Sequence, residues 1–392
     1  LEPRRVRFVR QTEQKGTGHA LMVGRDDLAP LSGLLVILYG DCPLISPETL
    51  RALLDTHRQS GAAGTVITTL LDDPTGYGRV LRDASGAVAA IVEQKAGTPE
   101  QLAVREINTG IYCFQADLFW RYIDRIRTDN PACEYYLTDI AGILTAAGHR
   151  IEPMRIADAG EVLGINNRVE LAQVDRLCRQ RAVHRLMLNG VTIEKPETVT
   201  IDEGVRIGQD TIIGPFAQIL GRSVIGSGCS IGACSIIQDS ELADRVEVGA
   251  FTIIGTSRVE SDAHIGPYAR LRMGNHVGPN AHIGNFVELK KTSMGAGSKA
   301  MHLAYLGDSE IGARVNIGAG TITCNYDGVA KHATGIRDGA FVGSNSTLVA
   351  PVVIGEGAYI AAGSVITHAV PPGALAIGRS RQSNKEGWKK RQ

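Results

Sequence analysis

Residues 201–237 read IDEGVRIGQDTIIGPFAQILGRSVIGSGCSIGACSII, with an isoleucine at every sixth position: Ile201, Ile207, Ile213, Ile219, Ile225, Ile231 and Ile237. An aliphatic residue keeps this period over residues 265–289 and again over residues 336–366. Six residues make one short strand and a turn, so three such units make one triangular coil. The inward aliphatic side chains then stack on those of the coils above and below. This period predicts a left-handed parallel β-helix of hexapeptide repeats over residues 191–370.

Residues 1–165 show a different pattern, in which short apolar runs alternate with helix-like segments. Such alternation is typical of an α/β domain whose mostly parallel sheet is covered by helices on both faces. The run Leu34 to Leu38 is expected to form a buried strand. Pro47 to His57 is expected to form a helix with Ser46 as its N-cap. Ligands of such sheets gather beyond the carboxyl ends of the strands, where Asp41 is expected to lie.

Residues 166–190 join these two domains. Apolar residues recur there at spacings of three or four, which predicts a linker helix. The recurring residues are Leu171, Val174, Cys178, Ala182 and Leu186. The last residues, 371–392, are expected to form a short basic tail. Its basic residues are Arg379, Arg381, Lys385, Lys389, Lys390 and Arg391.

The composition excludes several classes of protein. Lys and Arg (41) balance Asp and Glu (41), and this zero net charge argues against nucleic acid as a partner. No apolar run approaches the roughly 18 residues of a membrane span, and the opening residues lack the apolar core of a signal peptide. The 7 cysteines include no C-x-x-C pair, which is typical of reduced thiols. These features predict a cytoplasmic protein without membrane or nucleic-acid partners.

Two motifs of the front domain are suited to binding a nucleotide. The loop Gly16-Thr17-Gly18 can approach a base or a phosphate with its backbone N–H groups, because no Cβ atom intervenes. Asp41 is a natural Mg²⁺ ligand, and Mg²⁺ usually shares its site with substrate phosphates. The alternative interpretation is a tight turn and a helix-capping aspartate. The residues alone leave both interpretations open.

Two stretches of the solenoid carry residues that a repeat core does not need, at Lys290 to Tyr305 and at Asn316 to Lys331. Departures of this kind from a regular pattern are expected at functional sites. His302 is a candidate general base near neutral pH. Arg272, together with Lys290 and Lys331, is a candidate to hold an anionic substrate. A solvated loop is the alternative for His302, but its polar neighbours and the interrupted period favour a functional site.

Six motifs of the front domain resemble those of sugar nucleotidyltransferases: QTEQKGTGHA (11–20), YGDCPLI (39–45), DPTGYGR (73–79), IVEQK (91–95), EINTG (106–110) and EYYLTD (134–139). Four motifs of the solenoid are more specific: ARLR (269–272), GNFVELKK (284–291), HLAYLGD (302–308) and NIGAGTITCNYDG (316–328). Together they resemble the family of bifunctional N-acetylglucosamine-1-phosphate uridyltransferases and glucosamine-1-phosphate N-acetyltransferases. The resemblance extends over essentially all 392 residues.

This resemblance implies two reactions in the synthesis of UDP-N-acetylglucosamine, a precursor of peptidoglycan and lipopolysaccharide. The solenoid would transfer an acetyl group from acetyl-CoA to glucosamine-1-phosphate. The α/β Rossmann-like front domain would then transfer UMP from UTP to the product, with Mg²⁺. The family also implies a cytoplasmic homotrimer built through the β-helix, with acetyltransfer sites shared between subunits; closed rotational symmetry suits the flat faces of such a prism.

The resemblance also implies roles for individual residues. His302 would be the catalytic base of acetyl transfer. The sugar-phosphate contacts would be Arg272, Lys290, Tyr305, Asn316 and Lys331. The acetyl-CoA contacts would be Ala319, Asn325, Tyr326, Ser344, Ala362 and Arg379. The contacts to UDP-N-acetylglucosamine would be Gln11, Gly16, Thr17, Tyr39, Gly40, Asp41, Gly78, Glu93, Asn108 and Asn166. Asp41 and Asn166 would hold Mg²⁺.

One departure from the family concerns the start of the sequence. The family opens with a strand, a Gly-rich loop and a Pro-Lys pair, and the first of its motifs quoted above lies some way beyond them. The Gly-rich loop would hold the UTP phosphates with backbone N–H groups. We therefore expect the 392 residues to retain acetyl transfer and to have impaired or absent uridyl transfer.

Two other functions remain as alternatives. One is a sugar nucleotidyltransferase with a merely regulatory solenoid, as in ADP-glucose-type pyrophosphorylases. The other is a catalytically silent scaffold in which the solenoid only trimerises. Replacement of His302 by Ala separates the scaffold from the enzyme, because a scaffold would lose no activity.

Overall fold

The computed structural model describes residues 7–29 and 32–388. The opening residues 1–6 and the last three basic residues of the predicted tail, Lys389, Lys390 and Arg391, lie outside this range. The chain divides into two compact units, Leu1–Asp175 and Arg176–Gln392. Helix α7 (Arg168–Leu188) crosses this division, within the span 166–190 in which the linker helix was predicted.

The front unit contains one sheet and several helices. Its strands are β1 (Leu34–Ile37), β2 (Gly64–Leu70), β3 (Arg79–Arg82), β4 (Val88–Val92), β5 (Glu106–Gln115) and β6 (Ile151–Arg155). Its helices are α1 (Thr17–Val23), α2 (Arg25–Leu28), α3 (Pro47–Ser60), α4 (Pro99–Leu102), α5 (Ala116–Tyr122) and α6 (Asp139–Ala146). Short 3-10 turns are η1 (Ile123–Arg125) and η2 (Ala159–Val162).

The directions of these strands differ from the prediction. The sheet has the order β4-β3-β5-β2-β6, and β1 pairs with β5. Among the described strands β2 and β6 pair in parallel, whereas the pairs β1–β5, β2–β5, β3–β4 and β3–β5 are antiparallel. The expectation of a mostly parallel sheet was therefore wrong for these strands. Apolar runs indicate burial on both faces, but they do not encode the direction of the neighbouring strand.

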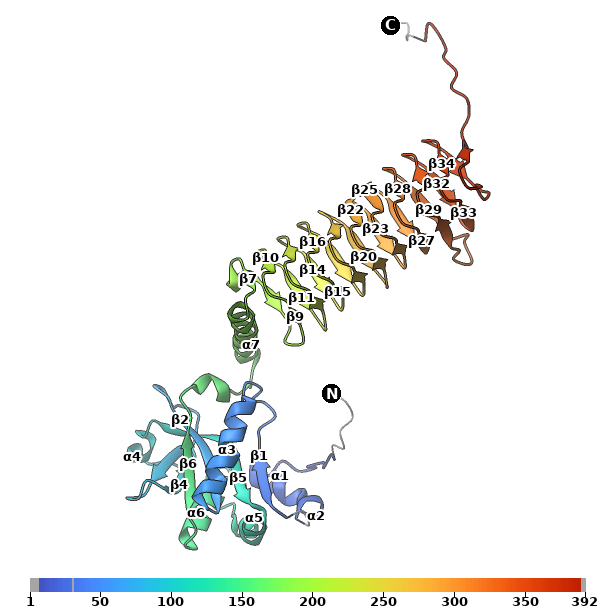
Figure 1. Cartoon of the computed structure of the whole chain (residues 1–392). Coiled ribbons are helices and arrows are strands. Elements are labelled where there is room, and N and C mark those ends of the chain that lie inside the picture. The colour runs from blue at the N-terminus through green and yellow to red at the C-terminus, as the bar shows by residue number, and fades with distance from the viewer. Residues whose placement is uncertain (1–6, 30–31, 389–392) are drawn as a thin grey trace. The chain divides into compact units, whose positions relative to one another are not determined.

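Helices cover both faces of this sheet, as predicted (Figure 1). Alternate residues of β2 point to opposite faces, so Val66 packs into the core that contains α5 and α6, and Ile67 packs with Leu53 of α3. Helix α3 begins as the sequence indicates, because the Ser46 hydroxyl accepts a hydrogen bond from the Thr49 N–H at 3.0 Å. Strand β2 is buried except at Leu70, and it contacts the helices on both faces of the sheet.

The run Leu34 to Leu38 forms strand β1, but the prediction that this strand is buried was wrong. Leu34 and Val36 are each 38% exposed and Leu38 is 46% exposed, whereas Ile37 is 7% exposed. The sequence shows that this run is apolar. It does not show which other segments pack against the strand, and this packing determines its burial. The strand still leads directly to the turn that carries Tyr39 and Asp41.

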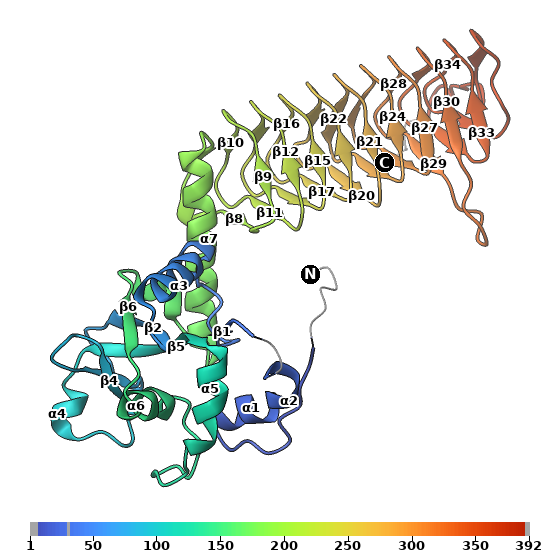
Figure 2. The ribbon, with the colours of Figure 1, turned by 60° about the horizontal axis from the view of Figure 1, so that its bottom comes forward.

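The second unit is a three-sided solenoid of parallel strands, which fits the left-handed β-helix predicted from the period (Figure 2). The first sheet contains β7 (Thr192–Ile193), β10 (Ile212–Ile213), β13 (Ser230–Ile231), β16 (Glu247–Val248), β19 (His264–Ile265), β22 (His282–Asn285), β25 (Lys299–His302), β28 (Asn316–Ile317), β31 (Phe341–Val342), β34 (Tyr359–Ile360) and β36 (Leu375–Ala376). The second contains β8 (Thr200–Ile201), β11 (Gln218–Leu220), β14 (Ile236–Gln238), β17 (Ile253–Gly255), β20 (Arg270–Arg272), β23 (Glu288–Lys290), β26 (Tyr305–Gly307), β29 (Ile322–Cys324), β32 (Thr347–Val349) and β35 (Val365–Ile366). The third contains β9 (Arg206–Ile207), β12 (Val224–Ile225), β15 (Glu241–Leu242), β18 (Arg258–Val259), β21 (His276–Val277), β24 (Ser293–Met294), β27 (Ser309–Ile311), β30 (Thr334–Ile336) and β33 (Val352–Ile354). A 3-10 turn, η3 (Pro196–Thr198), precedes β8.

The inward aliphatic side chains form the continuous core that the period predicted. In the second sheet Ile219 pairs with Ile237, and the column continues through Ile254 and Leu271. These residues are 18 and then 17 positions apart, so each coil is three repeats long with an occasional deletion of one residue. One step is longer, because Thr323 pairs with Leu348. The extra residues form a loop over 325–333, which we call the inserted loop.

The corner between the first and second sheets carries large exposed side chains in a left-handed backbone conformation. We call this set the corner ridge: Phe216, Phe251, Tyr268, Phe286 and Leu303, each with φ between 48° and 60°. The Tyr268 ring stacks between Phe251 and Phe286, with centroid separations of 5.1 and 5.3 Å. A positive φ is unfavourable for residues with a large side chain, so the corner is strained and apolar from Phe251 to Leu303.

Within residues 7–29 and 32–388, no helix combines the length and the hydrophobicity that crossing a membrane requires.

Candidate active sites

His302 ends strand β25 at the corner between the first and second sheets. Its Nδ1 atom lies 2.7 Å from Oδ1 of Asn285, which occupies the same position in the preceding coil. An amide oxygen only accepts hydrogen bonds, so this contact assigns the ring proton to Nδ1. The neutral ring then carries its lone pair on Nε2, and His302 is exposed. The side chain is thus held in the tautomer that a general base requires.

The coils beyond His302 place small residues in line with it. Strand register aligns His302 with Ala319, then with Ser344, and then with Ala362. The corner position directly after each of these residues changes as well. Leu303 occupies it after His302, whereas Gly320, Asn345 and Gly363 occupy it in the next three coils. At the far end the Arg379 Nε atom donates to the carbonyl oxygen of Ala362 at 2.8 Å. The corner therefore changes, at His302, from a bulky ridge to a strip of small residues.

Cationic side chains lie on the second sheet, at the ends of its strands that face the third sheet. Strand register places Arg272 of β20 next to Lys290 of β23. Arg272 forms an ion pair with Glu288. Lys290 is 3% exposed, and its Nζ atom lies 2.7 Å from Oδ2 of Asp308. Contact with the Lys290 ammonium, and its charge, lower the pKa of the exposed Lys331. The positive charge of Lys290 thus destabilises the charged form of Lys331. The negative charge of a bound phosphate would stabilise both ammonium groups.

The inserted loop contains Tyr326 and Lys331 and begins at the buried Asn325. Tyr326 and Lys331 form an isolated antiparallel bridge. Asp327 caps the turn between them by accepting hydrogen bonds from the N–H groups of Val329 and Ala330, at 2.8 and 2.7 Å. These backbone bonds, reinforced by His332, hold the pKa of Asp327 well below its ordinary value. The loop is therefore a folded hairpin that presents its side chains from the rim of the solenoid.

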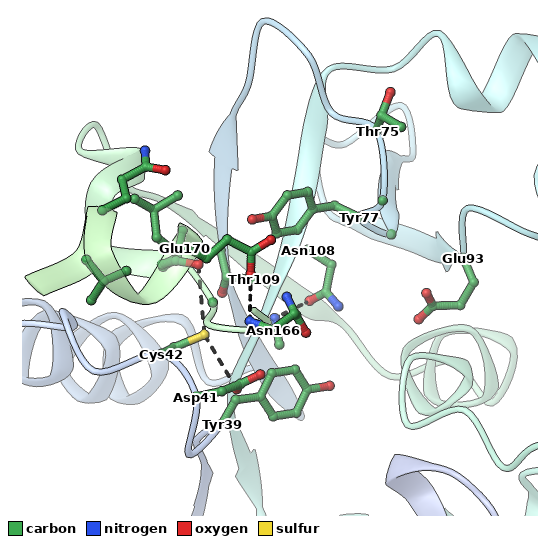
Figure 3. Close-up of a pocket in the computed structure, with 18 residues that line it drawn as sticks. Tyr39, Asp41, Cys42, Thr75, Tyr77, Glu93, Asn108, Thr109, Asn166 and Glu170 are labelled. Carbon is green, nitrogen blue, oxygen red and sulfur yellow. Dashed lines mark hydrogen bonds between the residues drawn. The ribbon is translucent and has the colours of Figure 1, made fainter. Parts of the chain in front are cut away.

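The front unit contains a cavity of about 510 Å³ that opens beside β1, β5 and the start of α7 (Figure 3). Of the residues predicted to contact the nucleotide sugar, six line it: Tyr39, Asp41, Gly78, Glu93, Asn108 and Asn166. Its charged lining residues are Asp41, Glu93 and Glu170. Within the described chain, no Lys, Arg or His is among the lining residues. A phosphate entering this cavity would meet carboxylates alone unless cations came with it.

Asp41 and Asn166 both line this cavity (Figure 3). Oδ2 of Asp41 and Nδ2 of Asn166 are both 3.9 Å from the point that a Cβ atom on Gly164 would occupy. A half-turn of the Asn166 amide would present its oxygen at the same place. Glu170 fixes this segment from the first turn of α7, because its Oε2 atom accepts a hydrogen bond from the Asn166 N–H at 2.6 Å. A carboxylate and an amide oxygen in this arrangement are suitable ligands for Mg²⁺.

Tyr39 connects the cavity to the Gly16-Thr17 segment. Burial, together with the charge of Glu93, raises the pKa of Tyr39 to about 12, so its hydroxyl stays protonated. A hydrogen bond with the Thr17 side chain acts in the opposite direction. The ring also requires glycine at position 110, where a Cβ atom would lie 2.0 Å from Cε2 of Tyr39. Glycine is therefore necessary at this point of the cavity wall.

The other predicted residues of the front unit lie beside the cavity. The Gln11 Nε2 atom donates to the carbonyl oxygen of Gly16 at 3.2 Å. Gly16 has a φ of +102°, and a Cβ atom there would lie 2.7 Å from the carbonyl oxygen of Tyr135. Gly40 lies in the exposed turn before Asp41. The structure thus gathers Gln11, Gly16 and Thr17 into one cluster that reaches the cavity through Tyr39.

Comparisons with known proteins agree with this arrangement. Residues 4–158 match the nucleotidyl transferase family, and residues 204–239 and 333–368 match the bacterial transferase hexapeptide family (six repeats). The bifunctional protein GlmU of Solibacter usitatus (strain Ellin6076) is 63% identical over 386 residues, 98% of this chain and 83% of that relative. The chain belongs to the GlmU family. The bifunctional protein GlmU of Koribacter versatilis (strain Ellin345) is 52% identical over 98% of this chain and 82% of that relative. Among solved structures, the UDP-N-acetylglucosamine acyltransferase of Francisella novicida aligns with 48% of this chain and 67% of that chain, at 24% identity and a TM-score of 0.31.

Membership of the GlmU family confirms the predicted fold class, a nucleotidyltransferase domain followed by a hexapeptide β-helix. The roles predicted for individual residues stay predictions, although the structure brings most of them into two groups. Asn316 lies on β28, which pairs with the strand of His302, and Tyr305 lies on β26, the next strand in the chain; Arg272 lies two strands from β26 in the second sheet, and Asn325 Nδ2 lies 3.5 Å from the Tyr305 hydroxyl. The predicted Lys290 contact also stays a prediction, and the structure adds that its ammonium is buried and paired with the Asp308 carboxylate.

Four residues of these GlmU-family sites were missed by the sequence reasoning: Asn285, Glu288, Asp308 and Glu170. A usable signal existed for Asn285. It precedes His302 by 17 positions, the length of one coil, so the period places the two side by side. Glu170 could have been recognised as the reciprocal partner of an Asn cap at the start of a helix. The ion pairs of Glu288 and Asp308 depend on side-chain directions that a repeat does not specify.

Proposed function

We propose that the solenoid of this chain transfers an acetyl group from acetyl-CoA to the amine of glucosamine-1-phosphate. We further propose that the front unit transfers UMP from UTP to the product, with Mg²⁺. The observation that carries the first proposal is the exposed His302, held in one tautomer by Asn285, with a group of cations on the next sheet. Both activities are those expected of a bifunctional GlmU-family enzyme.

Acetyl transfer needs a base and does not need a covalent intermediate. As the amine of the sugar attacks the thioester carbonyl carbon, Nε2 of His302 takes a proton from the attacking nitrogen. Collapse of the tetrahedral intermediate breaks the carbon–sulfur bond and releases CoA, and the amide product remains. Lys331 and Lys290 would attract the sugar phosphate. The strip of small residues through Ala319, Ser344 and Ala362 leaves room for the arm of acetyl-CoA.

Mg²⁺ fits the front cavity on two observations. The side chains of Asp41 and Asn166 both reach the same point beside Gly164, where a carboxylate oxygen and, after a half-turn of the amide, an amide oxygen could serve as ligands. Mg²⁺ typically takes one or two protein ligands and completes its shell with water and phosphate. The carboxylates of the cavity also require a cation before a nucleotide can bind. When bound, Mg²⁺ would neutralise the charge of the transferred phosphoryl group.

The two activities are measured separately in one preparation of the 392-residue chain. CoA release from acetyl-CoA and glucosamine-1-phosphate is expected. Pyrophosphate release from UTP, N-acetylglucosamine-1-phosphate and Mg²⁺ is the corresponding measurement for the front unit. A folded chain that releases no CoA would contradict the acetyltransferase assignment. A folded chain that releases no pyrophosphate would contradict the uridyltransferase assignment.

A cytoplasmic homotrimer is part of the same proposal. The corner ridge is a line of five large side chains, each 47–62% exposed, and contiguous exposed apolar surface of this kind marks an interaction site. Three copies related by a threefold axis would each cover the ridge of a neighbour, which closes the ring and leaves no ridge open. Because the ridge ends at His302, such packing would also bring a neighbouring subunit next to the predicted acetyl-CoA strip.

The double substitution Phe251→Asp and Tyr268→Asp is expected to convert the trimer into monomers at micromolar concentration, because it places charges in the stacked part of the ridge. Mass measured by light scattering during size-exclusion chromatography reports the change. The matched control is Val353→Asp, which adds a charge at an exposed apolar position of the third sheet. A wild-type monomer, or a ridge variant that remains trimeric, would show that the ridge is not the subunit contact.

A further inference from the structure

Asp308 lies outside the residues to which the resemblance gives a role, yet it contacts two of them. It occupies the corner between β26 and β27 with a φ of +48°. Its Oδ2 atom accepts a hydrogen bond from Nζ of Lys290 at 2.7 Å and another from Nδ2 of Asn325. One carboxylate oxygen thus joins a predicted sugar-phosphate contact to a predicted acetyl-CoA contact.

The main chain of Asp308 holds the same region. Its N–H donates to the carbonyl oxygen of Lys290 at 2.8 Å, and its carbonyl oxygen accepts from the N–H of Thr334 at 3.2 Å. Asn325 begins the inserted loop, and Thr334 directly follows it. Asp308 therefore bonds to the chain at both ends of the loop that carries Tyr326 and Lys331.

We infer that Asp308 is a positioning residue for acetyl transfer, which clamps the inserted loop and holds the Lys290 ammonium at the edge of the second sheet. The inference rests on the proposed acetyltransferase function, since the position of Tyr326 and Lys331 matters to catalysis only if the loop meets the substrates. Asp308 acts through these residues and need not touch a substrate itself.

The electrostatics of the contact explain why a charged residue is needed at this corner. Burial disfavours the ionised form of Asp308, but the bonds from Lys290 and Asn325 outweigh burial and lower the pKa of Asp308. The same carboxylate raises the pKa of Lys290. An ammonium that is buried without a counter-charge is strongly unfavourable. A neutral residue at position 308 would therefore drive Lys290 towards solvent and free one end of the inserted loop.

The test is Asp308→Asn, because asparagine tolerates a positive φ and removes the charge with little change of shape. The matched control is Asp239→Asn. Asp239 occupies the same corner between the second and third sheets, has a φ of +46° and donates its N–H to the preceding coil, as Asp308 does. Its carboxylate accepts a hydrogen bond from the Arg222 N–H and contacts no predicted site residue among the described bonds.

In Asp308→Asn we expect kcat/KM for CoA release to fall by about 10²-fold, the size of effect that displaced substrate contacts produce. The KM values for both acetyl-CoA and glucosamine-1-phosphate should rise. Asn325 of the predicted acetyl-CoA contacts and Lys290 of the predicted sugar-phosphate contacts would each lose the Asp308 carboxylate as a partner. Hydrogen exchange should become faster in residues 325–334 and stay slow in neighbouring coils. Asp239→Asn should match the wild type in all of these measurements.

Two results would overturn the inference. One is unchanged KM values together with unchanged exchange in the inserted loop. The other is a lower kcat at unchanged KM with faster exchange along the whole solenoid, which would indicate general destabilisation and a smaller active fraction. If the wild-type chain released no CoA, the proposed function would fail instead. The exchange of the loop in the two variants would still show whether Asp308 clamps it.

Discussion

Replacement of His302 by Ala is expected to lower the rate of CoA release by about 10²–10⁴-fold, the usual contribution of a positioned general base. The side chain is exposed and makes its described hydrogen bond to Asn285, so its removal leaves the core of the solenoid intact. Trimer mass and thermal stability should therefore match those of the wild type. The measurement is kcat for acetyl transfer at saturating substrates, with pyrophosphate release followed in parallel.

The control for this experiment is His282→Ala, which removes an imidazole one coil earlier on the same sheet. His282 stacks on His264 at a centroid separation of 4.5 Å and contacts none of the predicted site residues among the described interactions. It should retain full acetyl transfer. If His302→Ala also retained it, His302 would not be the base, and another group would have to accept the proton.

Asp41→Asn is expected to weaken binding of a divalent cation in the front unit by more than about 10-fold, because even partners one step removed from a metal contribute 10–100-fold to affinity. The change removes a negative charge from a cavity whose described charged residues are all carboxylates. Mn²⁺ binding followed by electron paramagnetic resonance measures the effect without depending on activity. Whatever pyrophosphate release the wild type shows should fall in proportion, whereas CoA release should not change.

Asp55→Asn provides the matched control for the cation site. Asp55 is an exposed residue of α3 that pairs with Arg58, so its neutralisation alters charge without altering the cavity. It should bind Mn²⁺ as the wild type does. Equal Mn²⁺ affinity in Asp41→Asn and in the wild type would place the cation elsewhere, and Asp41 would then be a residue of the turn after β1.

The solenoid could be predicted almost completely from the sequence, and the front unit only in outline. A residue such as Ile219 faces the core in every coil, so a short period determines its neighbours through the whole stack. In the front unit, Leu34 and Val36 look like core residues, but their burial depends on segments distant in the sequence. The direction of β2 relative to β5 also depends on segments distant in the sequence. For this reason the sequence predicted a mostly parallel sheet where these strands are antiparallel.

The candidate sites show a similar division. Motif resemblance drew attention to His302 and Asp41 because their chemistry is recognisable from residue type. The resemblance gave no sign that Lys290 is buried and paired with a carboxylate. Its partner, Asp308, lies 18 residues later in the sequence, in the next coil. Asn285 was equally hidden, although its coil spacing could have revealed it. Residue types therefore identified the candidate reacting groups, whereas the residues that contact them could be found only from the three-dimensional register.

The long step from Thr323 to Leu348 shows how such an architecture can acquire and vary a function. Each coil contacts only the coil before it and the coil after it, so extra residues at one corner leave the hydrogen bonding of distant coils unchanged. The few coils around His302 therefore form a local unit within a longer solenoid. Whole coils could be gained or lost between the linker helix and His302 during evolution without moving the candidate site residues relative to one another. A deletion in the coils that carry His302 and the inserted loop would remove several of these residues at once.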